Sequence, residues 1–92
     1  MRLEIAAKKD GTITGLRLRG LADLGAYPRD PSIPPLTGWL LSGVYKIGNI
    51  DLEIKTVYTN TMAVGAYRGA GRPEAAYFIE RMVDLLALEL GM

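Results

Sequence analysis

Two stretches within the first twenty residues alternate between apolar and polar positions, which is the period of a half-buried β-strand. In residues 2–8, Leu3, Ile5 and Ala7 fall on one face and the charged residues, with Ala6, fall on the other, and residues 16–19 repeat this pattern with leucine and arginine. Asp10 and Gly11 lie between the two stretches and suit the left-handed backbone of a tight turn. The pattern predicts a β-hairpin whose leucine face another element must cover.

The middle of the chain is broken by proline. Four of the five prolines fall within residues 28–35, so we expect an extended connector there. Leu36, Trp39 and Leu40 then follow at helical spacing, but two nearby glycines limit any helix to one or two turns. We interpret this short segment as a plug in the core beneath the hairpin.

Alternation returns at residues 51–59, which predicts a third strand. The following residues, 59–72, include Gly65, Gly69 and Gly71 and are predicted to form a loop. Together with the hairpin, this strand would give a small sheet.

The C-terminal residues carry the strongest helical pattern. Pro73 suits a first helical position, Glu74 complements the positive end of the helix dipole, and Gly91 suits a C-terminal stop. The apolar positions occupy more than half of the helix circumference, which is wider than the usual buried stripe. They are Ala75, Ala76, Phe78, Ile79, Met82, Val83, Leu85, Leu86, Ala87 and Leu90, with Leu88 on the polar side. The chain is therefore predicted to be an α+β domain, and a second copy or another subunit is expected to cover this helix.

Composition limits the available chemistry. The 92 residues suffice for one small domain, and a net charge of +1 provides no excess for gripping nucleic acid. The absence of cysteine and histidine excludes thiolate nucleophiles, imidazole bases and most transition-metal sites built from side chains. No apolar run approaches the roughly 20 residues of a membrane span, and no signal peptide is evident, so we expect a cytoplasmic protein with no membrane partner.

The glycine-rich loop is the best candidate for a binding site. In GAYRGAGRPE (65–74), unpaired backbone N–H groups and the start of the helix could hold an anion, with Arg68 and Arg72 as further donors. The alternative is that the glycines only form turns and the arginines are solvated. The spacing fits neither a P-loop nor a dinucleotide-binding fingerprint.

The segment VYTNTMAVGAYRGAGRPEAAYFIERMVDLLALELGM (57–92) resembles the molybdopterin-binding region of molybdenum hydroxylase large subunits, the family of xanthine oxidase and aerobic carbon monoxide dehydrogenase. The resemblance extends through DGTITGLRLRGLADLGAY (10–27) and LLSGVYKIGNI (40–50). Its most specific part, AYRGAGR (66–72), is similar to form II of the carbon monoxide dehydrogenase type. Authentic carbon monoxide oxidisers carry cysteine where Gly69 stands, which argues against carbon monoxide as the substrate.

The resemblance implies that residues 1–92 form a single partial molybdopterin-binding domain. It implies molybdopterin cytosine dinucleotide with molybdenum as the cofactor, contacted by Ala66, Tyr67, Arg68 and Gly69, and it places Ala70 at the substrate pocket. The family inserts oxygen from water into a C–H bond with the help of a glutamate base, and electrons pass to iron-sulfur clusters and flavin. That glutamate has no counterpart here, so no catalytic residue and no metal-ligating side chain is assigned.

Three functions remain open. The chain could be a piece of a split molybdenum-dependent oxidoreductase that works with other subunits, or a non-catalytic relative that forms a homo-oligomer through Phe78, Leu85 and Leu88. The third is a module that binds phosphoanions without molybdenum. Whether the chain acts as an enzyme is left undecided by the sequence.

Overall fold

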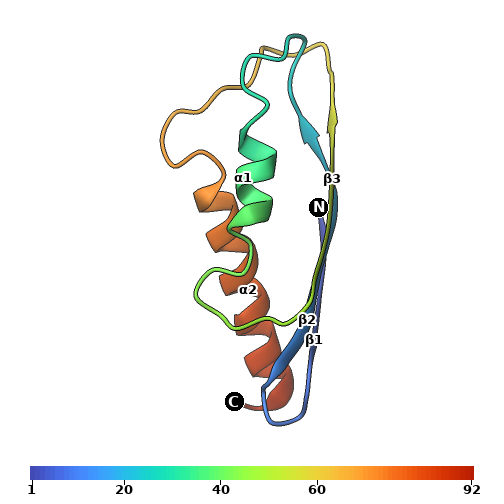
Figure 1. The fold of residues 1–92 in the computed structure, drawn as a ribbon, viewed down its shortest axis with the longest axis vertical. Coiled ribbons are helices and arrows are strands. Elements are labelled where there is room, and N and C mark those ends of the chain that lie inside the picture. Colours follow the sequence, from blue (N-terminus) through green and yellow to red (C-terminus); the bar gives the residue numbers. More distant parts are fainter.

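The computed structural model describes residues 1–92 as a three-stranded sheet with two helices packed on one face (Figure 1). The elements follow the order β1 (Arg2–Ala7), β2 (Ile13–Asp23), α1 (Ile33–Trp39), β3 (Ile50–Val57) and α2 (Arg72–Leu90). The predicted α+β arrangement of hairpin, third strand and long C-terminal helix is therefore confirmed.

Strand β2 lies at the centre of the sheet. It pairs antiparallel with β1 through the predicted hairpin, in which Gly11 has a φ of +88°, and it pairs parallel with β3. Parallel neighbours need a crossover, which the residues between β2 and β3, including α1, provide. Strand β2 continues through Gly20 to Asp23, although the alternation weakens there, and β3 ends at Val57 rather than at the predicted Thr59.

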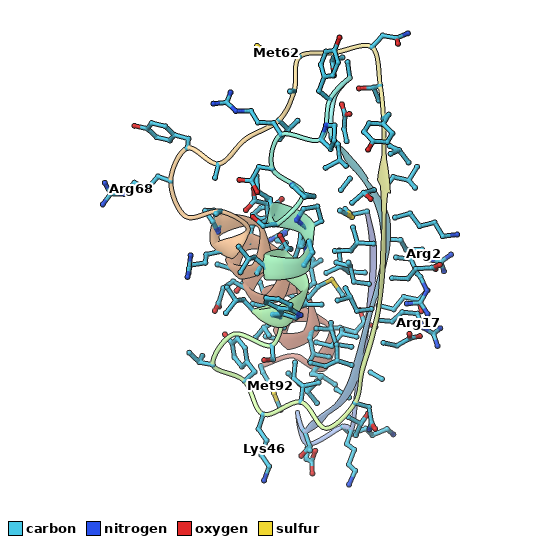
Figure 2. The ribbon with its side chains drawn as sticks, turned by 45° about the horizontal axis from the view of Figure 1, so that its top comes forward. Arg2, Arg17, Lys46, Met62, Arg68 and Met92 are labelled. Carbon is cyan, nitrogen blue, oxygen red and sulfur yellow. The ribbon has the colours of Figure 1, made fainter.

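The two faces of the sheet differ in polarity. Leu16 and Leu18 of β2 point toward the helices and are buried, and they form a core cluster with Leu41 and Ile79. The opposite face is charged and open to solvent, as the positions of Arg2 and Arg17 illustrate (Figure 2).

Helix α1 corrects two predictions. It begins at Ile33, so Pro34 and Pro35 lie inside its first turn rather than in an extended connector. Proline is tolerated there because the N–H groups of a first turn have no helical partner. Trp39 does not plug the core, since it is 77% exposed; Leu41, in the turn after the helix, is fully buried instead.

Helix α2 closely matches its predicted bounds and ends at Leu90, followed by Gly91, which has a left-handed backbone. Ala75 and Ile79 are buried, and Phe78 packs against the core cluster. Ala76 is exposed, contrary to the prediction, and Leu88 is 74% exposed. Neither helix has the length and hydropathy of a membrane span.

The chain buries little of its own surface. Only 10 of its 92 residues are buried, and the molecule measures 46 × 22 × 21 Å. Its accessible surface is 6444 Å², whereas a folded monomer of this mass exposes about 5,200 Å². The excess of about 1,200 Å² is comparable to the area that a protein contributes to a stable interface.

Candidate functional site

The predicted loop is present between β3 and α2. Residues 58–71 form neither helix nor strand and extend away from the sheet before α2 begins (Figure 1). The first half of the loop is tied to the connector that follows β2, because Ala26 N–H donates to the Thr61 carbonyl at 2.9 Å and Val64 N–H to the Leu24 carbonyl at 3.3 Å. The next link is a side-chain contact, in which Ala66 N–H donates to Oδ2 of Asp30 at 3.3 Å.

The second half of the loop carries unpaired donors. The N–H groups of residues 67–71 donate no hydrogen bond within the chain, and regular bonding resumes only where Arg72 N–H donates to the Gly69 carbonyl at 3.1 Å. These amides immediately precede the N-terminus of a 19-residue helix, which is the positive end of its dipole. Free N–H groups beside a helix N-terminus form an arrangement suited to an anion.

The backbone of this turn uses conformations that favour glycine. Gly69, Ala70 and Gly71 all have positive φ, at +90°, +42° and +86°. A Cβ atom on Gly71 would lie 2.6 Å from the Ile33 carbonyl oxygen and 2.8 Å from the Thr37 nitrogen. The end of the loop is therefore pressed against the backbone of α1, and only glycine allows this approach.

Gly69 is the position where the resemblance places a cysteine in carbon monoxide oxidisers. A Cβ on Gly69 would lie 2.8 Å from Cγ of Pro73, and the φ of +90° disfavours a side chain. The loop conformation of this chain therefore has no room for cysteine at position 69.

The two arginines of the loop behave differently. Arg68 projects away from the body of the molecule and forms no hydrogen bond or ion pair with the rest of the chain (Figure 2). Arg72 donates from Nη1 to the Gly69 carbonyl at 3.3 Å, so its guanidinium closes the turn. Arg68 is thus the guanidinium that is free to meet a ligand.

The structure brings the five residues assigned by resemblance together in this loop. The Ala66 N–H group donates a hydrogen bond to Asp30, Tyr67 is fully exposed, and Ala70 is half-buried. The amides of Tyr67, Arg68 and Gly69 are unpaired. Their roles toward a cofactor, and that of Ala70 toward a substrate, stay predictions.

The two glutamates nearest the loop, Glu74 and Glu80, both lie on α2. Glu74 lies in the first turn of α2, as the dipole argument predicts. Glu80 is engaged on the surface of the same helix, because its Oε2 accepts a hydrogen bond of 2.7 Å from the Tyr45 hydroxyl. This bond raises the pKa of Tyr45, whose ring packs against the core. Glu80 is therefore engaged by Tyr45, while Glu74 has the place expected of a partner of the helix dipole.

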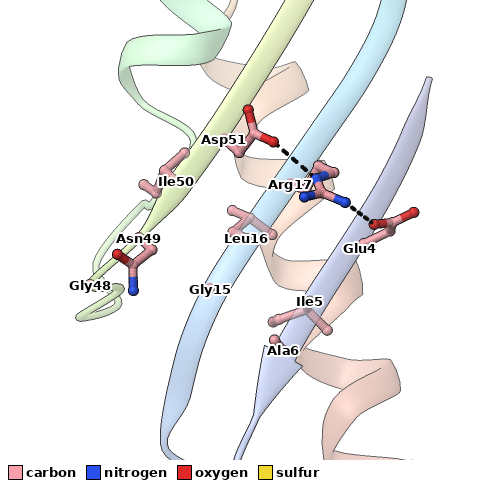
Figure 3. A pocket seen from close by; sticks show the side chains of 10 residues that line it. All are labelled: Glu4, Ile5, Ala6, Gly15, Leu16, Arg17, Gly48, Asn49, Ile50 and Asp51. Atoms are coloured by element: carbon pink, nitrogen blue, oxygen red, sulfur yellow. Dashed lines mark hydrogen bonds and ion pairs between the residues drawn. The ribbon is translucent and has the colours of Figure 1, made fainter.

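A separate hollow lies elsewhere, on the open face of the sheet. It has a volume of about 650 Å³ and is floored by Ala6 and Gly15 (Figure 3). The guanidinium of Arg17 crosses its rim but is already paired with Glu4 at 3.2 Å and Asp51 at 3.0 Å. The arginine face of β2 is thus neutralised by its neighbours, and an anion finds no free cation in this hollow.

Two residues support the loop, and nothing in the sequence indicates that they do. Asp30 precedes Pro31 and Ser32, a composition typical of a turn, but nothing local indicates that its carboxylate reaches Ala66. Thr37 is buried and borders Gly71, and its hydroxyl donates to the Ile33 carbonyl at 3.1 Å. The contacts of Asp30 with Ala66 and of Thr37 with Gly71 join segments that lie far apart in the sequence.

Comparisons with known proteins agree with the fold and show the family. The profile of the family described as "Molybdopterin cofactor-binding domain" matches residues 1–92. The chain is 46% identical to the carbon monoxide dehydrogenase large chain of Hydrogenophaga pseudoflava, over 97% of this chain and 12% of that protein. It is 34% identical to the 6-hydroxypseudooxynicotine dehydrogenase complex subunit gamma of Paenarthrobacter nicotinovorans, over 99% of this chain and 12% of that protein.

A solved structure shows the same arrangement of elements. The aldehyde oxidoreductase from Desulfovibrio gigas superposes with a TM-score of 0.88 at 34% identity, covering 98% of this chain and 10% of that one. The chain therefore spans about an eighth or less of the length of these three proteins. The family resemblance carried by AYRGAGR is confirmed over the whole chain.

Proposed function

This chain belongs to the molybdopterin cofactor-binding domain family, and on that basis we propose that it supplies the cofactor-contacting loop of a molybdenum-dependent hydroxylase or dehydrogenase. The observation that carries the proposal is the run of unpaired N–H groups at residues 67–71, directly before α2. Ala66, Tyr67, Arg68 and Gly69 would contact the cofactor, and Ala70 would face the substrate.

The donor set of the loop fits the proposed cofactor. Molybdopterin cytosine dinucleotide carries an anionic pyrophosphate and a metal-oxo centre, and both are acceptors for backbone N–H groups and guanidinium. When bound, the cofactor would supply the two-electron oxidation of a substrate C–H bond with oxygen from water. The chain itself would bind and orient: the unpaired amides of residues 67–70 would donate, and Arg68, which projects away from the body of the molecule, would meet an anionic oxygen.

We propose further that this chain does not complete catalysis alone. Its loop is open to solvent, with Tyr67 fully exposed, and the protein exposes far more surface than a monomer of its mass. Other polypeptide, from subunits of the same enzyme, would cover this surface and enclose the cofactor. Glu74 and Glu80 serve the helix dipole and the Tyr45 hydroxyl in the structure, so neither is assigned as a catalytic base.

The test is purification of the native complexes that contain this chain, followed by metal analysis and fluorescence assay of the oxidised pterin. Molybdenum and pterin should co-purify in equal amounts with the chain. Their absence from every such complex would reject the proposal. Replacing Arg68 by alanine should lower the bound cofactor, while Arg81→Ala, an equal charge change on the exposed side of α2, should not.

A second candidate function is self-association without catalysis. It is favoured by the uncovered apolar side chains of α2, where Leu88 is 74% exposed and Leu85 is 44% exposed. Phe78, which we expected in the same contact, packs against the core instead. Sedimentation velocity distinguishes the cases: this candidate requires an oligomer that Leu88→Glu dissociates, and a wild-type monomer would exclude it.

A third candidate, capture of a free phosphoanion, rests on the same unpaired amides. Calorimetric titration of the chain with inorganic phosphate and pyrophosphate tests it directly. Binding in the micromolar range by a complex that contains no molybdenum would favour this candidate, and no heat at millimolar ligand would end it.

A further inference from the structure

We infer that Asp30 is a positioning residue for the glycine-rich loop, holding its unpaired amides in place through the Ala66 N–H group. The inference rests on the proposed function of that loop, but its evidence is the geometry of the free chain. The residue lies on the connector between β2 and α1, and it contacts a loop residue 36 positions later in the sequence.

The carboxylate of Asp30 is itself held in place. Oδ1 accepts hydrogen bonds from both the backbone N–H and the hydroxyl of Ser32, the residue that precedes α1. This double contact leaves Oδ2 for Ala66 N–H, at 3.3 Å. The side chain thus joins the start of α1 to the point where the unpaired amides begin.

The other end of the loop is anchored on the same helix. Gly71 approaches α1 so closely that a Cβ would lie 2.6 Å from the Ile33 carbonyl and 2.9 Å from the Thr37 hydroxyl. The unpaired residues 67–71 therefore begin at an Asp30 contact and end at the α1 backbone. Of these two anchors, only Asp30 uses a side chain that can be replaced without a steric clash.

Beside the Asp30 anchor, a cavity of about 150 Å³ lies between the connector, α1 and the start of α2. Asp30 lines it together with Val64, Thr37 and Glu74, and none of residues 65–71 lines it. Within residues 65–71, the Gly69 carbonyl accepts from Arg72 and the Gly71 carbonyl accepts from Ala75, and both donors are close in sequence. The contact between Ala66 and Asp30 is therefore the one hydrogen bond that joins residues 65–71 to a distant part of the chain.

The ionised form of Asp30 is the one that accepts these bonds. Donation by the Ser32 hydroxyl and N–H, and then by Ala66 N–H, lowers the pKa of the carboxyl, and the positive charge of Arg29 acts in the same direction. Asp23 and Glu74 line the same cavity and are the other titratable groups that face it. The contact should hold at neutral pH and weaken only below the ordinary aspartate pKa of about 3.9.

Nuclear magnetic resonance of the free chain of residues 1–92 tests the inference. In Asp30→Ala, hydrogen exchange at Ala66 should quicken about tenfold or more, and the heteronuclear NOE of residues 66–71 should fall. Asp30→Asn keeps only one of the two acceptor oxygens that Ser32 and Ala66 use, so it should give a loss of order between those of wild type and Asp30→Ala. Asp84→Ala, on the exposed side of α2, is the matched control and should change neither signal.

A second measurement guards against misfolding of Asp30→Ala. The Ala66 amide shift of the wild-type chain should titrate with a midpoint below about 3.9, and Asp30→Asn should abolish this titration. An Ala66 amide that does not respond to acid, or loop dynamics unchanged in Asp30→Ala, overturns the inference. Because no cofactor is involved, this failure would leave the proposed function standing, and absence of molybdenum from the native complex would leave the Asp30 result standing.

Discussion

Gly71 is the position where one added methyl group should cost most. A Cβ there would lie 2.6 Å from the Ile33 carbonyl oxygen, 2.8 Å from the Thr37 nitrogen and 2.9 Å from the Thr37 hydroxyl. The φ of +86° costs about 1–2 kcal/mol for an L-residue, and displacing rigid backbone in a tight contact costs about 1–3 kcal/mol. Gly71→Ala should therefore lower the free energy of unfolding by about 2–5 kcal/mol, a large part of the stability of a small domain.

Substitutions at two other glycines separate the cost of the left-handed backbone from the cost of the contact with α1. Gly91 has a φ of +70°, but no atom lies within 4 Å of the position that an added methyl group would take, so Gly91→Ala measures the backbone cost alone, about 1 kcal/mol. Gly48 has neither a left-handed φ nor a neighbour within 4 Å, so Gly48→Ala gives the baseline. Urea unfolding followed by circular dichroism at the helix band measures all three. The contact with α1 would be refuted if Gly71→Ala cost no more than Gly91→Ala.

Two further predictions concern the core and the charged face of the sheet. Ile79→Ala should lower the free energy of unfolding by about 2–5 kcal/mol because the Ile79 side chain is only 1% exposed. Leu88 is 74% exposed, so Leu88→Ala should change that free energy by less than about 0.5 kcal/mol. Equal costs of the two substitutions in urea titrations would contradict this assignment of the α2 faces. Arg19 and then Arg17 lower the pKa of Asp51 by donating hydrogen bonds to it, so its stabilisation is complete above the unfolded pKa of about 3.9 and is lost as the pH falls through the lower folded value. The difference in urea midpoint between wild type and Asp51→Asn should accordingly shrink in acid, and a difference that stays constant across that range would show that Asp51 gains nothing from its charge.

The secondary structure is largely predictable from the sequence because local pattern decides it. Alternation marks the hairpin, and Pro73 and Gly91 bracket the C-terminal helix to within one residue of its observed bounds. The errors arise where a local rule has a positional exception. The proline-rich composition predicts an extended connector at Pro34 and Pro35, but these residues occupy the first turn of α1, where their missing N–H groups cost nothing.

Burial is less predictable than secondary structure. The size and spacing of Trp39 favour a place in the core, yet Leu41 fills that place. Which apolar residue is buried depends on where the helix ends and how the chain turns afterwards, and the spacing of residues alone does not fix that. The wide apolar stripe of α2 predicts an excess of exposed apolar surface, and the exposure of Leu85 and Leu88 confirms it.

By itself the sequence determined the element types, the family and the position of the glycine-rich loop, because periodicity and the AYRGAGR motif are local properties of the chain. Only the tertiary structure decided how that loop is held. The Asp30 carboxylate meets Ala66, and Gly71 meets α1, through contacts between segments that are distant in sequence. Such contacts depend on how the connector and α1 pack against the sheet, and this packing leaves the amides of residues 67–71 unpaired.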